Sequence, residues 1–341
     1  MIQIVTVLDS LYFTSMIPDI EVNCYDWLTF TLSRGGTELL KERYWANDKS
    51  RVWVRDLGKV IASDLGEIAG LAADYTMNFT DGNTSDTKNF RVLLGEYRTE
   101  LSTQTFVDVN FLTLNDSAKI THAWQKEILS IYTTVPVDVT IETVSLDGTR
   151  TGPSILRSIS EINQVVEMNV SAANVLANPA GLSRYIIKAG SRLMVYYLNN
   201  DTRREQPEIL FRNAFGCREI FVAGGLLERS NDYENSVGYI RDMLFRFRTK
   251  EIKKFVCNTG VLREKQSQWV EDLMVSNEVF LLIGSDLVPI TITDAKVLRT
   301  NAPDELISFD FNYQLSKPGI YGAGKIDIKR IFDDTFDYTF H

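Results

Sequence analysis

The oxygen-bearing side chains at positions 81–86 form the first group whose spacing suggests chemistry. Asp81, Asn83 and Ser85 alternate along the chain, as the first ligands of a calcium-binding loop do. Asp86 stands where the sharp turn of such a loop requires Gly, and Val92 stands where its bidentate Glu belongs. The segment therefore favours a solvated polar loop over a Ca²⁺ site.

Aspartates near the C-terminus form a second acidic group. Asp327, Asp333, Asp334 and Asp337 offer paired carboxylates or ligands for a divalent metal ion. Paired carboxylates do chemistry only where a pocket fixes their separation and splits their pKa values, and a terminal segment rarely builds such a pocket alone. We therefore expect no metal-binding or catalytic residue in this segment.

Cys257 is the cysteine with the most suggestive neighbours. Lys253 and Lys254 precede it and could lower the pKa of its thiol, but the apolar pair Phe255-Val256 favours a buried, structural cysteine. The nucleotide, protease and hydrolase motifs GxxxxGK[ST], HExxH, GxSxG and GxGxxG are absent from the sequence. We predict that the protein is not an enzyme and needs no cofactor. A glycosidase would require two carboxylates across a cleft, which distant strands can supply.

Three tryptophans suggest a different kind of site. Trp27, Trp45 and Trp53 fall within one predicted hairpin region. Exposed rings of this kind stack on sugars in carbohydrate-binding sandwiches, whereas buried ones pack a core or an interface. Packing is the favoured interpretation, and a carbohydrate-binding or receptor-binding protein is the alternative.

The composition describes a folded protein with little affinity for nucleic acid. The chain has 341 residues, 44% of them hydrophobic, and a net charge of −9, which fits two or three domains and argues against disorder. No basic stripe for phosphate contacts stands out, so sequence-specific nucleic-acid binding is not expected. His122 and His341 are too few for a His-based zinc site. The cysteines are widely spaced and no signal-peptide pattern is present, which predicts synthesis in the cytoplasm. No long apolar run is present, so we expect no membrane insertion.

The elements that must position these residues are mostly strands. In residues 307–315 every odd-numbered residue is apolar and every even-numbered one is polar, which predicts a half-buried strand. Met243, Phe245 and Phe247 alternate in the same way. Further strands are predicted at 28–32, 52–55, 90–97, 127–132, 137–143, 165–170 and 185–198, the last with a turn at 189–191.

Helical patterns are few. Apolar residues fall on one face of a predicted helix at 262–276, with Asn258-Thr259-Gly260 as its capping segment, and 60–68 is a shorter candidate. Polar turn clusters lie at 81–86 and 147–153, and the stretch at 199–207 is the most linker-like. The expected fold class is mainly β, with three modules in a multi-module β-sandwich chain. Their predicted limits are 1–100, 101–203 and 204–318, followed by an arm at 319–341.

Two parts of the sequence resemble a known group of proteins. Residues 111–132 (FLTLNDSAKITHAWQKEILSIY) and 136–144 (PVDVTIETV) are similar to the central region of β-rich virion proteins of tailed bacteriophages and prophages. Residues 211–221 (FRNAFGCREIF) resemble the entry to the C-terminal domain of that group. In that group a domain with one helix and a final alternating strand follows, here at 262–276 and 307–315. The arrangement is also similar to the tail-tube and distal-tail fold, in which subunits form a ring.

The resemblance implies a structural role in a phage tail, at the tail tip, the baseplate or a connector ring. It implies a homo-oligomer that contacts other tail or virion proteins, located in the virion tail and assembled in the host cytoplasm. No catalytic, cofactor-binding or metal-binding residue is carried over. The apolar residues of the C-terminal arm either fold back on their own domain or dock on a neighbouring subunit; these interface candidates are Ile331, Phe332, Phe336, Tyr338 and Phe340.

Overall fold

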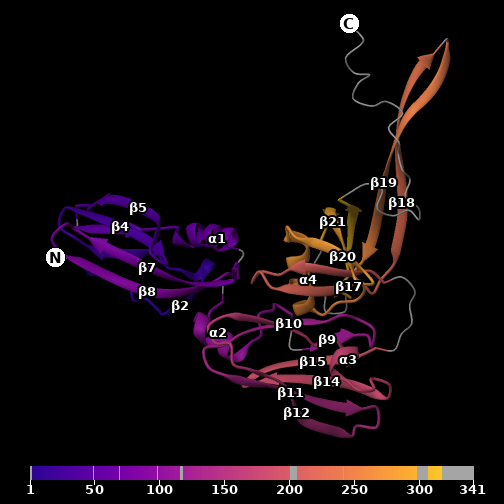
Figure 1. The fold of residues 1–341 in the computed structure, drawn as a ribbon, viewed down its shortest axis with the longest axis horizontal. Helices are drawn as coiled ribbons and strands as arrows, with labels where there is room; N and C mark the ends of the chain where they lie inside the picture. The colour runs from indigo at the N-terminus through magenta and orange to yellow at the C-terminus, as the bar shows by residue number, and fades with distance from the viewer. Residues whose placement is uncertain are drawn as a thin grey trace.

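The computed structural model describes residues 2–48, 50–68, 70–97, 99–115, 118–199, 206–240, 242–297 and 306–316. The chain is mainly β and builds several sheets in succession, which confirms the predicted class of multi-module β-sandwich chain. Figure 1 shows an N-terminal part (residues 2–97), a central part (118–199) and a C-terminal part (206–316). The predicted module limits and the tail-tube-like character of the last module stay predictions.

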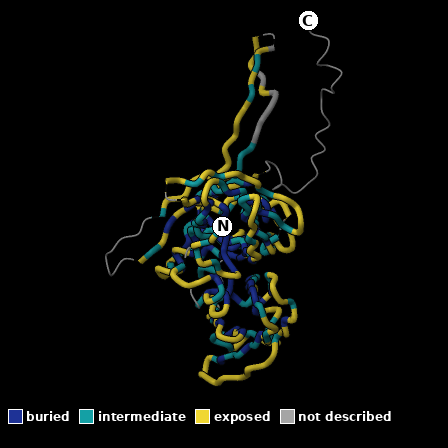
Figure 2. Tube along the Cα trace, turned by 90° about the vertical axis from the view of Figure 1, so that its left-hand side faces the viewer, coloured by how far each residue is buried: buried dark blue, intermediate teal, exposed yellow. Residues whose placement is uncertain are grey.

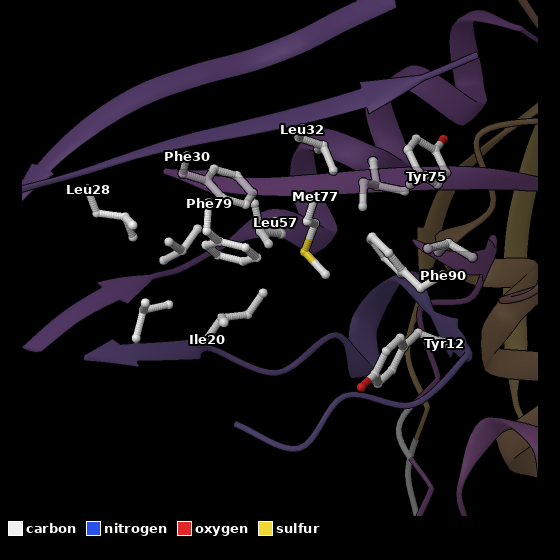
Figure 3. Packing of buried hydrophobic residues seen from close by; sticks show 14 of the residues in the cluster. Tyr12, Ile20, Leu28, Phe30, Leu32, Leu57, Tyr75, Met77, Phe79 and Phe90 are labelled. Carbon is white, nitrogen blue, oxygen red and sulfur yellow. The ribbon is translucent and has the colours of Figure 1, made fainter. Parts of the chain in front are cut away.

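The N-terminal part is a sandwich of two sheets with a helix at one end. The larger sheet has the order β2-β8-β7-β4-β5, formed by Leu11–Phe13, Ser85–Leu93, Ala72–Thr80, Trp27–Arg34 and Thr37–Trp45. The smaller sheet has the order β1-β3-β6, formed by Gln3–Ile4, Ile20–Asn23 and Arg51–Val54. Between them lies an apolar core in which Phe30 and Phe79 pack at a ring distance of 5.2 Å (Figure 3).

Helix α1 (Leu57–Glu67) closes this core, and its start and end lie within a few residues of the predicted helix at 60–68. It buries one polar side chain with the apolar ones. Asp64 accepts hydrogen bonds from Arg34 Nε at 2.7 Å and from the Tyr75 hydroxyl at 2.8 Å. These partners satisfy a carboxylate that burial would otherwise penalise, and the Arg34 guanidinium holds its pKa below the ordinary value.

The central part is a second sandwich. Its main sheet has the order β12-β11-β14-β15-β9, formed by Arg150–Ile159, Val137–Ser145, Leu182–Ala189, Arg192–Leu198 and Ala118–Thr121. Strands β10 (Ile128–Tyr132) and β13 (Val165–Asn169) form the facing two-stranded sheet. The core contains the stacked rings of Tyr185 and Tyr196, and the one-turn helix α3 (Ala172–Val175) lies at its edge.

The C-terminal part is one seven-stranded sheet with the order β17-β16-β20-β21-β22-β19-β18. These strands are Arg218–Val222, Glu208–Arg212, Val279–Ile283, Asp286–Ala295, Asp310–Leu315, Met243–Asn258 and Leu227–Ile240. Helix α4 (Glu264–Val275) packs on it through Trp269, Val270 and Leu273. Among the described residues 206–316 this part carries one helix and ends on strand β22. The predicted alternation of Phe309, Phe311, Tyr313 and Leu315 into the core is confirmed by their burial.

An aromatic cluster joins the three parts. Phe215, in the turn between β16 and β17, lies 5.3 Å from the ring of Phe13 and 5.5 Å from that of Phe106. Phe106 belongs to α2 (Thr103–Val109), the helix that links the N-terminal and central parts. Gly216 has a φ of +69°, a left-handed backbone conformation that favours glycine in this turn.

Several predicted boundaries differ from the structure. Strand β8 already begins at Ser85, within the predicted polar loop, and β12 begins at Arg150, within the predicted turn cluster at 147–153. The N-cap of α4 is Arg263, whose amide donates to Gln266 Oε1 at 3.1 Å, and the predicted capping segment at 258–260 lies outside the helix. Helices α2 and α3 had no counterpart in the sequence analysis, because one or two turns are too short to show a period.

Candidate functional site

The most unusual feature of the fold is a two-stranded ribbon that extends from the C-terminal sheet (Figure 1). Strands β18 and β19 pair from Leu227↔Cys257 to Ile240↔Met243, but β19 pairs with β22 only from Lys254 to Asn258. Residues 231–240 and 243–253, here called the ribbon, therefore have no third strand among the described residues. At 3.4 Å a residue, their length is about 30 Å.

The outer end of the ribbon is apolar and exposed. Tyr239 is 77% exposed, and its ladder partner Leu244 is 57% exposed. Val237 and Met243 are exposed beside them. In Figure 2 the described residues of the projecting segment have the exposed or intermediate colour, whereas buried residues gather in the body of the molecule below it. Exposed apolar side chains at the end of a long projection are typical of a surface that contacts another protein.

Polar contacts hold the lower ribbon strands together. Lys254 Nζ lies 2.6 Å from Asp232 Oδ2, and Tyr233 and Asn231 both donate to Glu251 Oε1. These contacts are exposed, so each contributes little to stability. An isolated two-stranded hairpin is marginally stable in water, and the ribbon therefore gains most from a further strand or surface beside it.

A buried polar seam fixes the base of the C-terminal sheet against the central part. Lys119, on β9, lies 2.6 Å from Glu127 Oε2 and donates to the Ile220 carbonyl of β17 at 2.7 Å. Its ammonium group also lies 4.8 Å from the ring centre of Trp269, on α4. Gln125 Nε2 donates to Glu127 Oε1 at 2.6 Å. Burial raises the pKa of Glu127, and the Lys119 charge opposes that change.

A second carboxylate, Glu219, completes the seam. It accepts from the indole nitrogen of Trp269 and, at 2.8 Å, from Asn213 Nδ2, which also donates to the Leu112 carbonyl. Burial raises the pKa of Glu219. Residues 111–132 and 211–221 supply most of these groups. The seam thus has a structural role: every polar group named here is satisfied by another part of the fold.

Asp272, on α4, holds the turn that carries Phe215. Its Oδ2 accepts from the Ala214 amide at 3.1 Å, and the Ala214 carbonyl accepts from the Glu96 amide of the N-terminal part at 2.8 Å. Burial raises the pKa of Asp272 to about 7, and the nearby carboxylates of Glu219, Glu96 and Glu271 add to the effect. The folded junction between the parts is therefore more stable when Asp272 is protonated.

The candidate calcium loop at 81–86 uses its first carboxylate within its own turn. Asp81 Oδ1 accepts hydrogen bonds from the backbone amides of Asn83 and Thr84. Cys257 is buried and unpaired, as are Cys24 and Cys217, and burial raises the pKa of the Cys257 thiol to about 12. The prediction that Cys257 is a buried, structural cysteine is therefore confirmed. The aspartates at 327–337 and the interface candidates Ile331, Phe332, Phe336, Tyr338 and Phe340 lie outside the described residues.

The tryptophans do not form one platform. Trp27 and Trp45 face each other across the β4–β5 ladder, with Trp27 half-buried beneath the Arg43 guanidinium, 4.4 Å from its ring centre. Trp53 lies on β6, in the other sheet. Trp45 is 68% exposed and so does not pack in the core of this chain, while packing at an interface stays a prediction for it. In the described parts of the chain, no group of three His, Cys, Asp or Glu side chains is placed to hold a metal ion.

Comparisons with known proteins assign no family. No protein-family model and no curated protein matches the sequence. Among solved structures the chain is similar to a chimeric titin Z1Z2 functionalized with a KLER exogenous peptide from decorin. That match has 14% identity and a TM-score of 0.17, and it covers 59% of this chain and 97% of the other. A similarity this low supports no conclusion about fold or function. None of the helices in the described segments is long and apolar enough to cross a bilayer.

Proposed function

We propose that this protein is a structural subunit of a bacteriophage or prophage tail, at the tail tip, the baseplate or a connector ring. It acts by assembling with copies of itself and with other tail proteins. The observation that carries the proposal is the ribbon, which leaves two strand edges and an apolar end without a partner in the described chain. Natural proteins protect such edges unless they are used for pairing.

The charges of the ribbon strands support pairing between copies. Strand β18 has three acidic residues, Glu228, Asp232 and Glu234, and one basic residue, Arg229. Strand β19 has five basic residues and one acidic residue, Glu251. If the β18 edge of one copy lies beside the β19 edge of the next, opposite charges meet in cross-strand pairs. Such a contact joins two different surfaces of the chain, and contacts of this type form closed rings where the rotation between copies closes and open filaments where it does not.

The resemblance of residues 111–132 and 211–221 to phage virion proteins supports the tail assignment. These segments form the buried seam, which orients the sheet from which the ribbon extends. A permanent assembly of this kind buries on the order of 2,000 Å² or more per interface.

Sedimentation velocity of the purified chain tests the proposal. Ser230 and Lys254 are ladder partners, so residues 231–253 can be replaced by a two-residue Asn-Gly turn without breaking the sheet below. We expect the full chain to sediment as an oligomer and the shortened chain as a folded monomer. Leu146→Asp, at an exposed turn of the central part, is the matched control and keeps the oligomer. A full chain that stays monomeric at micromolar concentration contradicts the proposal.

A further inference from the structure

The outward face of the larger N-terminal sheet has an unusual composition. Along β4, β7 and β8 the residues that alternate with the core carry neutral hydroxyl or amide groups almost throughout; they are Thr29, Thr31, Ser33, Thr76, Asn78, Thr80, Ser85, Thr87 and Asn89. Ladder pairs place them in adjacent rows, such as Thr31↔Asn78 and Asn78↔Thr87. All of them are exposed or half-buried.

One end of this face carries an aromatic pair. Trp27 and Trp45 are direct ladder partners, so their side chains lie on the same face in the row next to Thr29. Arg43 covers Trp27 from one side, and a Cβ at Gly82 would lie 3.1 Å from its ring, so Trp27 is held in place. Trp45 beside it is left open to solvent. Trp45 therefore presents a flat ring from a strand, and little side-chain conformational entropy is lost when a ligand binds to it.

The opposite end of the face leads into a cavity of about 720 Å³ between the N-terminal and central parts. Thr76 and Asn89 belong both to the face and to the cavity lining, and Asn163 lines it from the central part. Arg91 lies at its floor, where it binds Asp74 at 2.7 Å and the Asn163 carbonyl at 2.6 Å. Trp27 and Ser33 are six residues apart on β4, so the distance from the aromatic pair to the cavity is roughly 20 Å.

We propose that this face is a binding site for a neutral polysaccharide chain. The Trp45 ring stacks on the apolar face of a sugar, because aromatic rings combine a large apolar area with a fixed geometry. The Thr, Ser and Asn side chains match sugar hydroxyls, since each can both donate and accept hydrogen bonds. The site extends to the cavity, where Asn89 and Asn163 contact the end of the chain.

The chemistry of the face favours this occupant over another protein. The centre of a stable protein interface is apolar, whereas this face has no aliphatic side chain along its β4, β7 and β8 rows. Basic side chains lie at the rim of the face, where Arg43 and Lys41 of β5 are the ladder partners of Thr29 and Thr31 and Arg91 is paired with Asp74. The rows of hydroxyl and amide groups between them are neutral, which favours a neutral ligand over a charged one. The inference concerns a surface distant from the ribbon and does not depend on assembly (Figure 1).

Affinity electrophoresis in native gels containing mannan, dextran, galactan or mixed-linkage β-glucan tests this site. We expect at least one of these neutral polysaccharides to retard the protein. Trp45→Ala and Asn78→Ala weaken the retardation roughly tenfold or more. Trp45 is exposed, whereas Asn78 is half-buried and accepts a hydrogen bond from Ser85, so the melting temperature of each variant is measured beside its retardation to separate loss of binding from loss of folding. Trp53→Ala, on the other sheet, is the matched control and leaves retardation unchanged.

Three outcomes overturn the inference: no retardation by any of the four polysaccharides, retardation that Trp45→Ala does not change, and retardation by the anionic polymer heparin alone. The chain with the shortened ribbon separates this site from the proposed assembly. It keeps polysaccharide binding if the face acts by itself, so loss of oligomers and loss of binding report on different surfaces.

Discussion

The ammonium group of Lys119 donates to the backbone carbonyl of Ile220 at 2.7 Å, across 101 positions of sequence. The same group is paired with Glu127 at 2.6 Å. One charged side chain thus links the central part to the edge strand of the C-terminal sheet. Since the ribbon extends from that sheet, the seam around Lys119 sets the direction in which the candidate assembly surface is presented.

Removing the Lys119 charge should destabilise the seam strongly. Lys119→Met leaves Glu127 buried without a cation, and we expect a loss of about 3–5 kcal/mol in the free energy of unfolding. Urea unfolding followed by intrinsic fluorescence measures it. The double variant Lys119→Met/Glu127→Gln should recover much of the loss. Lys188→Met removes an exposed cation and leaves Glu142 paired with Arg150, so it should cost about 0–1 kcal/mol. Equal losses for the two lysines would refute the role of burial.

The stability of the junction should fall as pH rises toward neutrality. Burial raises the pKa of Asp272 from 3.8 to about 7, so the folded chain holds this proton more tightly than the unfolded chain does. Between about pH 4 and pH 7 the folded state binds more protons, and the contribution of Asp272 to stability is lost progressively as pH rises. The difference amounts to roughly 4 kcal/mol by pH 8.

Asp272→Asn isolates this effect because it keeps an oxygen acceptor for the Ala214 amide and cannot ionise. The variant should match the wild type near pH 4 and become more stable than it as pH rises to 8. Chemical unfolding of both proteins at several pH values measures the difference. A difference that does not change with pH would show that Asp272 does not titrate in this range.

Phe215 should control how the parts are joined. Phe215→Ala removes a fully buried ring from the cluster with Phe13, Phe106 and Tyr97, at a cost of about 3–5 kcal/mol. We expect faster proteolysis near α2 and a larger radius of gyration in solution scattering. Phe30→Ala, in the N-terminal core, is the control that lowers stability without changing the scattering of the folded protein. An unchanged scattering profile for Phe215→Ala would argue against this joint.

The apolar end of the ribbon should be needed for assembly but not for folding. Tyr239→Asp and Leu244→Asp place charges on an exposed ladder pair, so the melting temperature of the monomer should not change. Charges at the centre of an apolar contact are costly when desolvated, and light scattering should show oligomers dissociating at least tenfold more readily. Oligomers as stable as the wild type would place the contact elsewhere.

The strands that bury one whole face could be predicted from the sequence. Residues 309–315 and the helix at 264–275 show clean periods because one side of each meets a core. Strand β5 was not predicted, because both of its faces are largely exposed or half-buried, and β12 is interrupted by Gly152-Pro153. The alternation of Thr76, Asn78 and Thr80 with Tyr75, Met77 and Phe79 was a usable signal for the polar face that the sequence analysis missed.

The buried polar seam could not be predicted from the sequence, and the reason is physical. Lys119, Glu127 and Glu219 are residue types that normally lie in water, and their partners are up to 101 positions away. The local pattern predicts the opposite orientation: Ala118 and Ile120 alternate with Lys119 in the short strand β9, which favours an outward lysine, whereas Lys119 is buried and Ile120 is exposed. The ribbon, too, was visible only as alternating residues, since alternation does not tell whether a third strand lies beside a hairpin.

Electron cryomicroscopy of the purified full-length chain tests the central claim most directly. We predict closed rings in which the β18 edge of each copy lies against the β19 edge of its neighbour, with Tyr239 and Leu244 buried between copies. Isolated monomers, or oligomers whose ribbons stand free in solvent, would contradict the account.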